Sequence, residues 1–148
     1  MLAKSLVIFI SVGILSGFLF GFYLLDIKNT NQLVFVDGSS ISIVTEKSDF
    51  KKGEEIKIIL VNSGTTPITY SDSSYGLKIS GLFGIMMYSP NVSHVVTTLN
   101  PKEEAVFFWD QMKNDKAPVL EGLYKISSNG IDPSGNSVER SITINIWK

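Results

Sequence analysis

The sequence predicts an all-β protein, an antiparallel β-sandwich that is preceded by one transmembrane helix. The stretch from Ser5 to Leu25 contains 21 residues without a charged side chain, whereas the rest of the chain holds short β-branched runs separated by turn-forming residues. No amphipathic helical pattern follows the first stretch, which favours sheets packed on sheets. The expected division is a transmembrane anchor at residues 1–27, a stalk with the first strand at 28–40, and the sandwich at 41–148.

The uncharged stretch has the length of a membrane-spanning helix, because a hydrocarbon core of about 30 Å requires roughly 20 apolar helical residues. The alternative is a cleaved secretory signal. Signal cores are shorter, at about 7 to 15 residues, and end at small residues, whereas the residues from Phe22 to Leu25 are bulky. Lys4 on the short N-terminal side favours a single-pass protein of the cell membrane, with a cytoplasmic N-terminus and an extracytoplasmic C-terminal domain.

Three glycines lie four residues apart within this stretch, at Gly13, Gly17 and Gly21. Residues with this spacing share one face of a helix, and small residues there let a second helix approach closely. The face therefore predicts helix-mediated self-association or a membrane partner. The alternative is that glycine is simply frequent in membrane helices.

Composition excludes several classes of function. The chain has 13 basic and 14 acidic residues, so no basic stripe is available for nucleic acid. It has no cysteine, which removes disulfides, thiol catalysis and thiolate metal sites. The 120 or so residues after the anchor suffice for one ordinary domain with a single core.

The strands are predicted from short apolar runs bounded by Gly, Ser, Asn or Pro. The last run shows the pattern most clearly, because its isoleucines at 142, 144 and 146 alternate with polar or amphipathic residues. In chain order the expected strands are Leu33–Val36, Ile41–Val44, Ile56–Val61, Ile68–Tyr70, Leu77–Ile79, Gly84–Tyr88, Val95–Leu99, Ala105–Trp109, Leu123–Ser127 and Ser141–Trp147.

A long hairpin loop is expected at residues 129–136, which are rich in Gly, Asn, Asp and Ser. Asp132 and Asn136 could hold a cation there. A solvated turn is the favoured interpretation, because one carboxylate is far short of the six to eight oxygen ligands that calcium needs.

The middle and the end of the domain resemble a known family. The residues that carry the resemblance are Phe50, Gly53 and Glu54 before the Ile56 strand, Asn62 after it, Leu99, Pro101 and Glu103 before the run from Val106 to Gln111, and Gly122 with Tyr124. Together they resemble the intracellular proteinase inhibitor domain of the BsuPI type over about Ile41 to Ile146. The resemblance implies an immunoglobulin-like sandwich and binding of a protease or another protein.

The motif residues of this resemblance have structural interpretations of their own. Tyr124 after Gly122 is typical of a tyrosine corner, in which the phenol bonds to upstream backbone. Trp109 is expected in or beside the core, and Asp110 and Gln111 are expected to hold the following turn through side-chain to backbone hydrogen bonds. A direct binding role for these residues is the alternative.

Neither catalysis nor a cofactor is expected. His94 is the only histidine, and neither a nucleophile relay nor a zinc site can be built around it from the local sequence. The neighbouring pairs Glu54–Glu55 and Glu103–Glu104 are expected to point to opposite faces of their strands. No phosphate-binding loop is present in the sequence.

One apolar segment is a candidate protein-binding patch. Glycines flank it at Gly81 and Gly84, and it carries two methionines, which adapt to irregular partners. The alternative, which we favour from the sequence, is a buried strand with a tight glycine turn, because exposed apolar patches are uncommon on single domains. The residues of the patch are Leu82, Phe83, Ile85, Met86 and Met87.

The expected function is a membrane-anchored extracytoplasmic module that binds an unidentified protein partner or acts as a scaffold. A membrane-tethered protease inhibitor is the alternative, and the loop from Met112 to Pro118, with Lys113 and Lys116, is the sequence's candidate for an inhibitory loop. Asn91 begins a glycosylation sequon that could be modified outside the cell.

Overall fold

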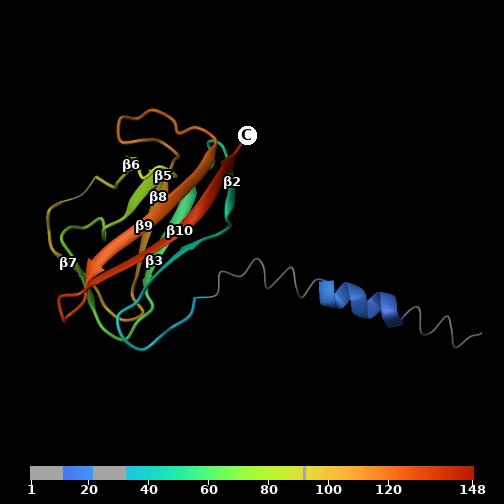
Figure 1. Ribbon diagram of the computed structural model, residues 1–148, viewed down its shortest axis with the longest axis horizontal. Coiled ribbons are helices and arrows are strands. Elements are labelled where there is room, and N and C mark those ends of the chain that lie inside the picture. The colour runs from blue at the N-terminus through green and yellow to red at the C-terminus, as the bar shows by residue number, and fades with distance from the viewer. Residues whose placement is uncertain (1–11, 22–32, 92) are drawn as a thin grey trace, which may run out of the picture. The chain divides into compact units, whose positions relative to one another are not determined.

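The computed structural model describes residues 12–21, 33–91 and 93–148. It consists of two compact units, Met1–Gln32 and Leu33–Lys148 (Figure 1). In the described residues of the first unit, positions 12–21 form an α-helix. The remainder of the predicted span, residues 5–11 and 22–25, lies outside the described residues. Within the described ranges, no helix combines the length and the hydropathy that crossing a membrane requires.

The second unit is built from strands, so the prediction of an all-β domain is confirmed. The described strands are β1 (Ile41–Thr45), β2 (Asp49–Lys51), β3 (Ile56–Asn62), β4 (Ile68–Tyr70), β5 (Lys78–Gly81), β6 (Met86–Tyr88), β7 (Thr97–Leu99), β8 (Glu104–Trp109), β9 (Gly122–Ile131) and β10 (Ser137–Trp147). They form a three-stranded sheet in the order β1-β3-β8 and a larger sheet in the order β2-β10-β9-β4-β7, with β5 paired to β9 and β6 paired to β5.

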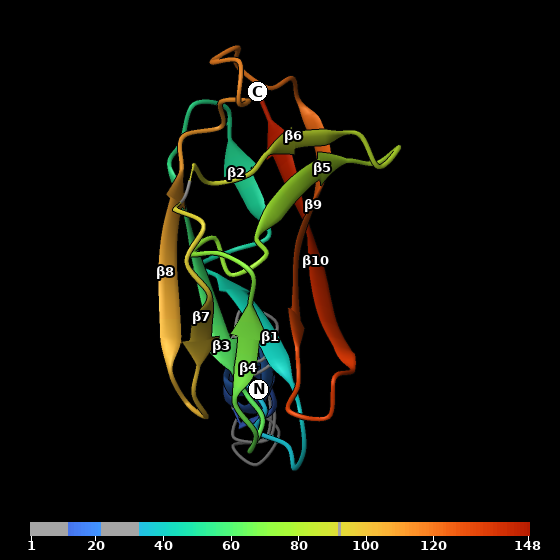
Figure 2. The same cartoon turned by 90° about the vertical axis from the view of Figure 1, so that its left-hand side faces the viewer.

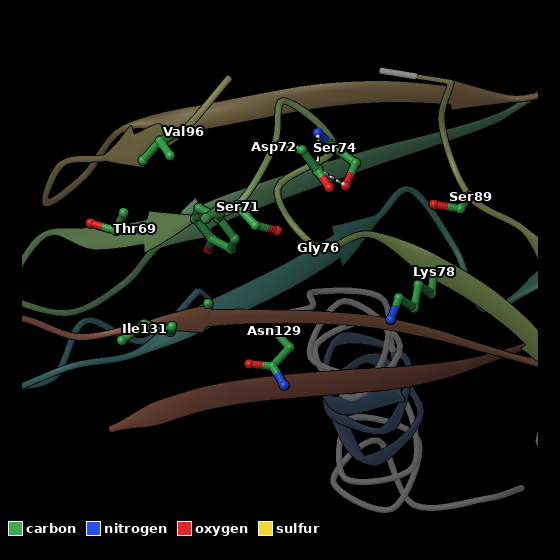
Figure 3. Close-up of a pocket in the computed structure, with 12 residues that line it drawn as sticks. Thr69, Ser71, Asp72, Ser74, Gly76, Lys78, Ser89, Val96, Asn129 and Ile131 are labelled. Atoms are coloured by element: carbon green, nitrogen blue, oxygen red, sulfur yellow. Dashed lines mark hydrogen bonds between the residues drawn. The ribbon is translucent and has the colours of Figure 1, made fainter. Parts of the chain in front are cut away.

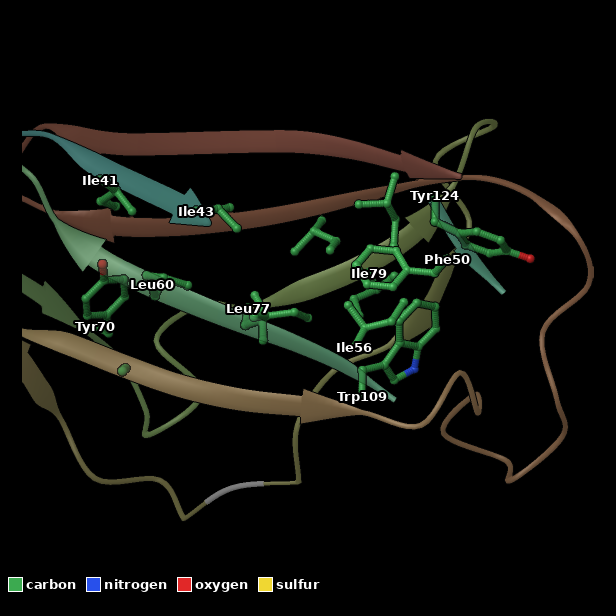
Figure 4. Packing of buried hydrophobic residues seen from close by; sticks show 14 of the residues in the cluster. Ile41, Ile43, Phe50, Ile56, Leu60, Tyr70, Leu77, Ile79, Trp109 and Tyr124 are labelled. Atoms are coloured by element: carbon green, nitrogen blue, oxygen red, sulfur yellow. The ribbon is translucent and has the colours of Figure 1, made fainter. Parts of the chain in front are cut away.

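The two sheets enclose one core. Strand β3 turns Ile56, Ile58 and Leu60 inward, and β10 turns Ile144 and Ile146 inward from the opposite sheet. Lys57 and Ile59 of β3 and Asn145 of β10, which lie between these positions, are more exposed, as period-two burial requires. Figure 4 shows side chains of both sheets meeting in this layer, and Leu77 and Ile79 belong to the same cluster.

One strand pair departs from the predicted antiparallel arrangement. Strand β2 runs parallel to β10, with Phe50 opposite Ile146, because the chain leaves β1 in the small sheet and crosses directly to the edge of the large one. Such crossings between sheets are a feature of packed sandwiches. The sequence did not predict β2, since three residues with the single apolar Phe50 are too short for a periodic signal.

Several predicted boundaries were wrong. Strand β6 begins at Met86 rather than Gly84, and β10 begins at Ser137 rather than Ser141. Residues 33–36 are not a strand, because they have no ladder partner and only Val36 N bonds to the Ser63 carbonyl, at 2.9 Å. Strand β7 begins at Thr97, two residues after the predicted start. The predicted loop 129–136 shortens to residues 132–136, because Asn129 to Ile131 continue β9 and pair with β10.

Candidate functional site

Trp109 belongs to the core. Its side chain is 1% exposed, and its ring lies edge-on to Tyr124 with the centroids 5.9 Å apart. The indole Nε1 donates a hydrogen bond to the Met112 carbonyl at 2.8 Å, so the polar atom of this large side chain is satisfied. This geometry agrees with the expectation that Trp109 lies in or beside the core, and the buried side chain offers no surface for direct binding.

Gln111 and Asp110 hold different turns. The Asp110 carboxylate accepts a hydrogen bond from Met112 N at 3.0 Å, within the expected turn. Gln111 instead reaches the turn between β2 and β3: its amide oxygen accepts from Gly53 N at 2.8 Å, and its amide nitrogen donates to the Lys51 and Glu54 carbonyls. Gln111 therefore fixes a distant turn, which the sequence did not reveal.

Tyr124 has the geometry of a tyrosine corner. Its hydroxyl donates to the carbonyl of Leu120, four residues upstream, at 2.6 Å. Gly122 between them adopts φ 143°, a conformation that glycine accommodates best. Burial raises the pKa of the Tyr124 phenol, and the Leu120 hydrogen bond partly offsets that effect. The family-like motif thus consists of residues that hold the fold.

The lysine-bearing loop at Met112 to Pro118 is closed by its own backbone. Lys113 N donates to the Ala117 carbonyl and Lys116 N donates to the Lys113 carbonyl, both at 2.9 Å. Lys116 also adopts a positive φ of 65°. This loop therefore does not present an extended segment that could pair with a protease cleft.

The segment between β5 and β6 is the candidate binding surface. We call residues 82–86 the finger. Its tip side chain, Phe83, is 94% exposed, and Leu82, Ile85 and Met86 are each more than half exposed. The expectation of a buried strand was therefore wrong. The predicted patch also needs one correction, because Met87 turns toward the core and packs against it.

The base of the finger is fixed by backbone pairing. Gly81 N donates to the Ile85 carbonyl at 3.0 Å, Gly84 N donates to the Gly81 carbonyl at 2.9 Å, and Gly84 adopts φ 76°. Strand β5 pairs with β9 along its whole length. On the other side, Asn114 N bonds to the Met87 carbonyl. A positioned hairpin thus presents apolar side chains that the described domain does not cover, and Figure 2 shows it projecting from the sheet.

A pocket of about 520 Å³ lies where β9 changes its edge neighbour from β5 to β4 (Figure 3). The Asp72 carboxylate in its wall accepts hydrogen bonds from the Ser74 hydroxyl and from Ser74 N. These bonds hold the pKa of Asp72 below its usual value, and the Ser74 hydroxyl is the main cause. The carboxylate is committed to its own turn, and the other charged residue in the lining of this pocket is Lys78.

The remaining candidates fall at separate places. Asp132 accepts hydrogen bonds from Ser134 N, Asn136 N and the Ser39 hydroxyl, which lower its pKa and make it the anchor of a closed turn. Asn91 is exposed in the segment between β6 and β7, and His94 lies exposed in the same segment. Among the described residues, no group of three metal-binding side chains comes together.

The helix at residues 12–21 carries the predicted glycine face. A Cβ atom added to Gly13, Gly17 or Gly21 would meet no atom within 4 Å outside the helix. The described residues of this unit therefore leave the face uncovered.

No protein-family model and no curated protein matches the chain. Solved structures with a similar arrangement include Spo0M, a sporulation control protein from Bacillus subtilis, at 15% identity and a TM-score of 0.42 over 76% of this chain. Another is PorZ, a surface component of the type-IX secretion system of Porphyromonas gingivalis, at 14% identity and a TM-score of 0.38 over 72% of this chain. The alignments cover 51% and 12% of those two chains, and they carry no inference about activity.

Proposed function

We propose that the chain is a membrane-anchored, extracytoplasmic module that binds a protein partner through the finger. The anchor is residues 1–27, and the domain is an immunoglobulin-like sandwich of the BsuPI type. One observation carries the proposal: a backbone-fixed hairpin holds four large apolar side chains in solvent, with Phe83 94% exposed.

Exposure of this kind favours association. Burying one large apolar side chain contributes about 1.5–3 kcal/mol, and aromatic anchors of this type often dominate interface energies. The finger is already ordered by its hydrogen bonds, so binding costs little conformational entropy. Val106 and Phe108 are also exposed, on β8, but they lie within a strand of the small sheet rather than at the tip of a hairpin.

The position of the finger suits presentation to a partner. In Figure 2 the β5–β6 hairpin lies at the end of the domain that also holds the C-terminus, whereas the chain enters the domain, at residues 33–40, at the opposite end. Residues 33–40 and the finger are thus at opposite ends of the sandwich. Self-association through the helix face of Gly13, Gly17 and Gly21 would cluster such modules in the membrane.

A membrane-tethered protease inhibitor is the second candidate, and it rests on the BsuPI-type resemblance. Its loop would be Met112 to Pro118, with Lys113 or Lys116 as the residue offered to the protease. That loop does not present an extended segment to a protease cleft, which favours the finger over it as the contact surface.

The test is affinity capture with the full chain, solubilised from the membranes of the cells that produce it. Replacing Phe83 by serine is expected to lower partner recovery about tenfold or more, as loss of an aromatic hot spot does, without changing the melting temperature. Phe108→Ser is the matched control, because Phe108 is an exposed aromatic residue on a different surface. Equal recovery by the parent and both variants would exclude the finger as the contact.

A further inference from the structure

A cleft of about 350 Å³ lies at the base of the finger, and we call it the lysine cleft. One side is apolar and comes from the finger, through Leu82 and Met86. The other side is polar and comes from the sheet. The polar side consists of Lys78, Ser80, Lys125 and Ser127.

The strand register places two amines on the same face of the sheet. Lys78 of β5 pairs with Ser127 of β9, and Ser80 pairs with Lys125. Directly opposed residues share a face, so Lys78 and Lys125 are diagonal neighbours, with Cα atoms about 7–8 Å apart. Met86 continues the row of Ser80 and Lys125 across β6. The apolar wall and the two amines therefore border one cleft.

Neither amine forms an ion pair among the described residues, although Lys78 also lines the pocket that holds Asp72. Within the described ranges, the ion pairs are Lys47 with Glu54 and Lys52 with Glu121, and the lining of the cleft contains no acidic residue. Like charges on neighbouring strands repel. An anion between Lys78 and Lys125 would relieve that repulsion, and the Ser80 and Ser127 hydroxyls are able to donate hydrogen bonds to it.

We propose that the lysine cleft receives a carboxylate from an acidic, apolar segment of the partner protein. The inference rests on the proposed function and names the chemistry of its partner. The carboxylate lies between Lys78 and Lys125, while an adjacent apolar side chain of the same segment packs on Leu82 and Met86. The finger supplies affinity, and the lysine pair supplies orientation and selectivity for acidic partners.

The surface fits a protein segment better than a lipid surface. Recognition of anionic lipids typically uses clusters of 4–8 basic residues, whereas the cleft has two and the whole chain has a net charge of −1. The finger also lies at the end of the domain opposite residues 33–40, which lead to the anchor.

The test uses the full chain in phosphatidylcholine nanodiscs and two labelled seven-residue peptides. One alternates leucine and glutamate, and the other has glutamine in place of each glutamate. Fluorescence anisotropy is expected to give a dissociation constant about threefold to tenfold lower for the glutamate peptide, the range of one or two exposed ion pairs. Lys78→Gln with Lys125→Gln should abolish this preference, whereas Lys57→Gln with Lys148→Gln, a charge-matched control, should retain it.

The outcomes separate the inference from the proposed function. Equal binding of the two peptides by the parent, absence of binding by both, or a preference that survives in the Lys78 and Lys125 variant would each overturn the carboxylate site. The proposed function fails separately, if Phe83→Ser leaves partner capture unchanged. The carboxylate site would also be overturned, in favour of a lipid surface, if the parent bound phosphatidylglycerol vesicles and showed no preference for the glutamate peptide.

Discussion

Replacing Trp109 by alanine is expected to lower the free energy of unfolding of the domain by about 3–5 kcal/mol, the range for deletion of large buried aromatic side chains. The indole is 1% exposed and packs against Tyr124 and Tyr88, with ring centroids 5.9 and 6.2 Å away. Its loss leaves a cavity and frees the Met112 carbonyl from its hydrogen bond. Urea unfolding of the full chain in detergent, followed by circular dichroism, measures the effect.

Trp147→Ala is the control for that measurement. Trp147 is 51% exposed near the end of β10, and substitutions at such surface positions change stability by about 0.5 kcal/mol or less. An equal loss of stability in the two variants would contradict the core assignment of Trp109. Unchanged stability of Trp109→Ala together with lost partner binding would make Trp109 a binding anchor instead.

Replacing Gly76 by alanine is expected to cost at least about 3 kcal/mol, because the change combines backbone strain with an unavoidable clash. Gly76 adopts φ +61°, and a Cβ there would lie 2.2 Å from the carbonyl oxygen of Asn129 in β9. That oxygen belongs to the backbone of a paired strand, so it cannot move aside cheaply. The same urea titration gives the free energy.

Gly53→Ala is the control that separates the cost of backbone strain from the cost of the steric clash. Gly53 has a similar φ of +82°, but a Cβ there would meet no atom within 4 Å. This variant is expected to lose only about 1–2 kcal/mol, the cost of left-handed backbone for a residue with a side chain. If Gly76→Ala is no less stable than Gly53→Ala, the close approach of the Gly76 backbone to β9 does not constrain the domain.

The sequence predicted the regular part of the fold well, because burial there follows period two. The alternating residues of β3 and β10 point inward as expected, and Tyr124 bonds to Leu120 in the geometry of a tyrosine corner. The short β2 and the end of β9 were not predictable. The pairing of β2 depends on a residue distant in the sequence, because Asp49 pairs with a residue 96 positions later. The end of β9 depends on the space that Gly130 leaves beside the Tyr70 ring.

The candidate site was only partly predictable from the sequence. The apolar segment at 82–87 was identified, but a run of apolar residues looks the same in a buried strand and in an exposed hairpin. Its exposure follows from where β5 stops pairing with β9, at Gly81 opposite Tyr124. The nearness of Lys78 and Lys125 likewise depends on strand register, and no local pattern in the sequence encodes it.

Photocross-linking from the finger tests the central claim most directly. A benzophenone amino acid at position 83 of the full chain, activated in intact membranes, is expected to form a discrete adduct with a protein. The same group at position 108, also an exposed phenylalanine, should form no such adduct. Adducts of equal yield at both positions, or adducts only with lipid at position 83, would contradict a protein-binding finger.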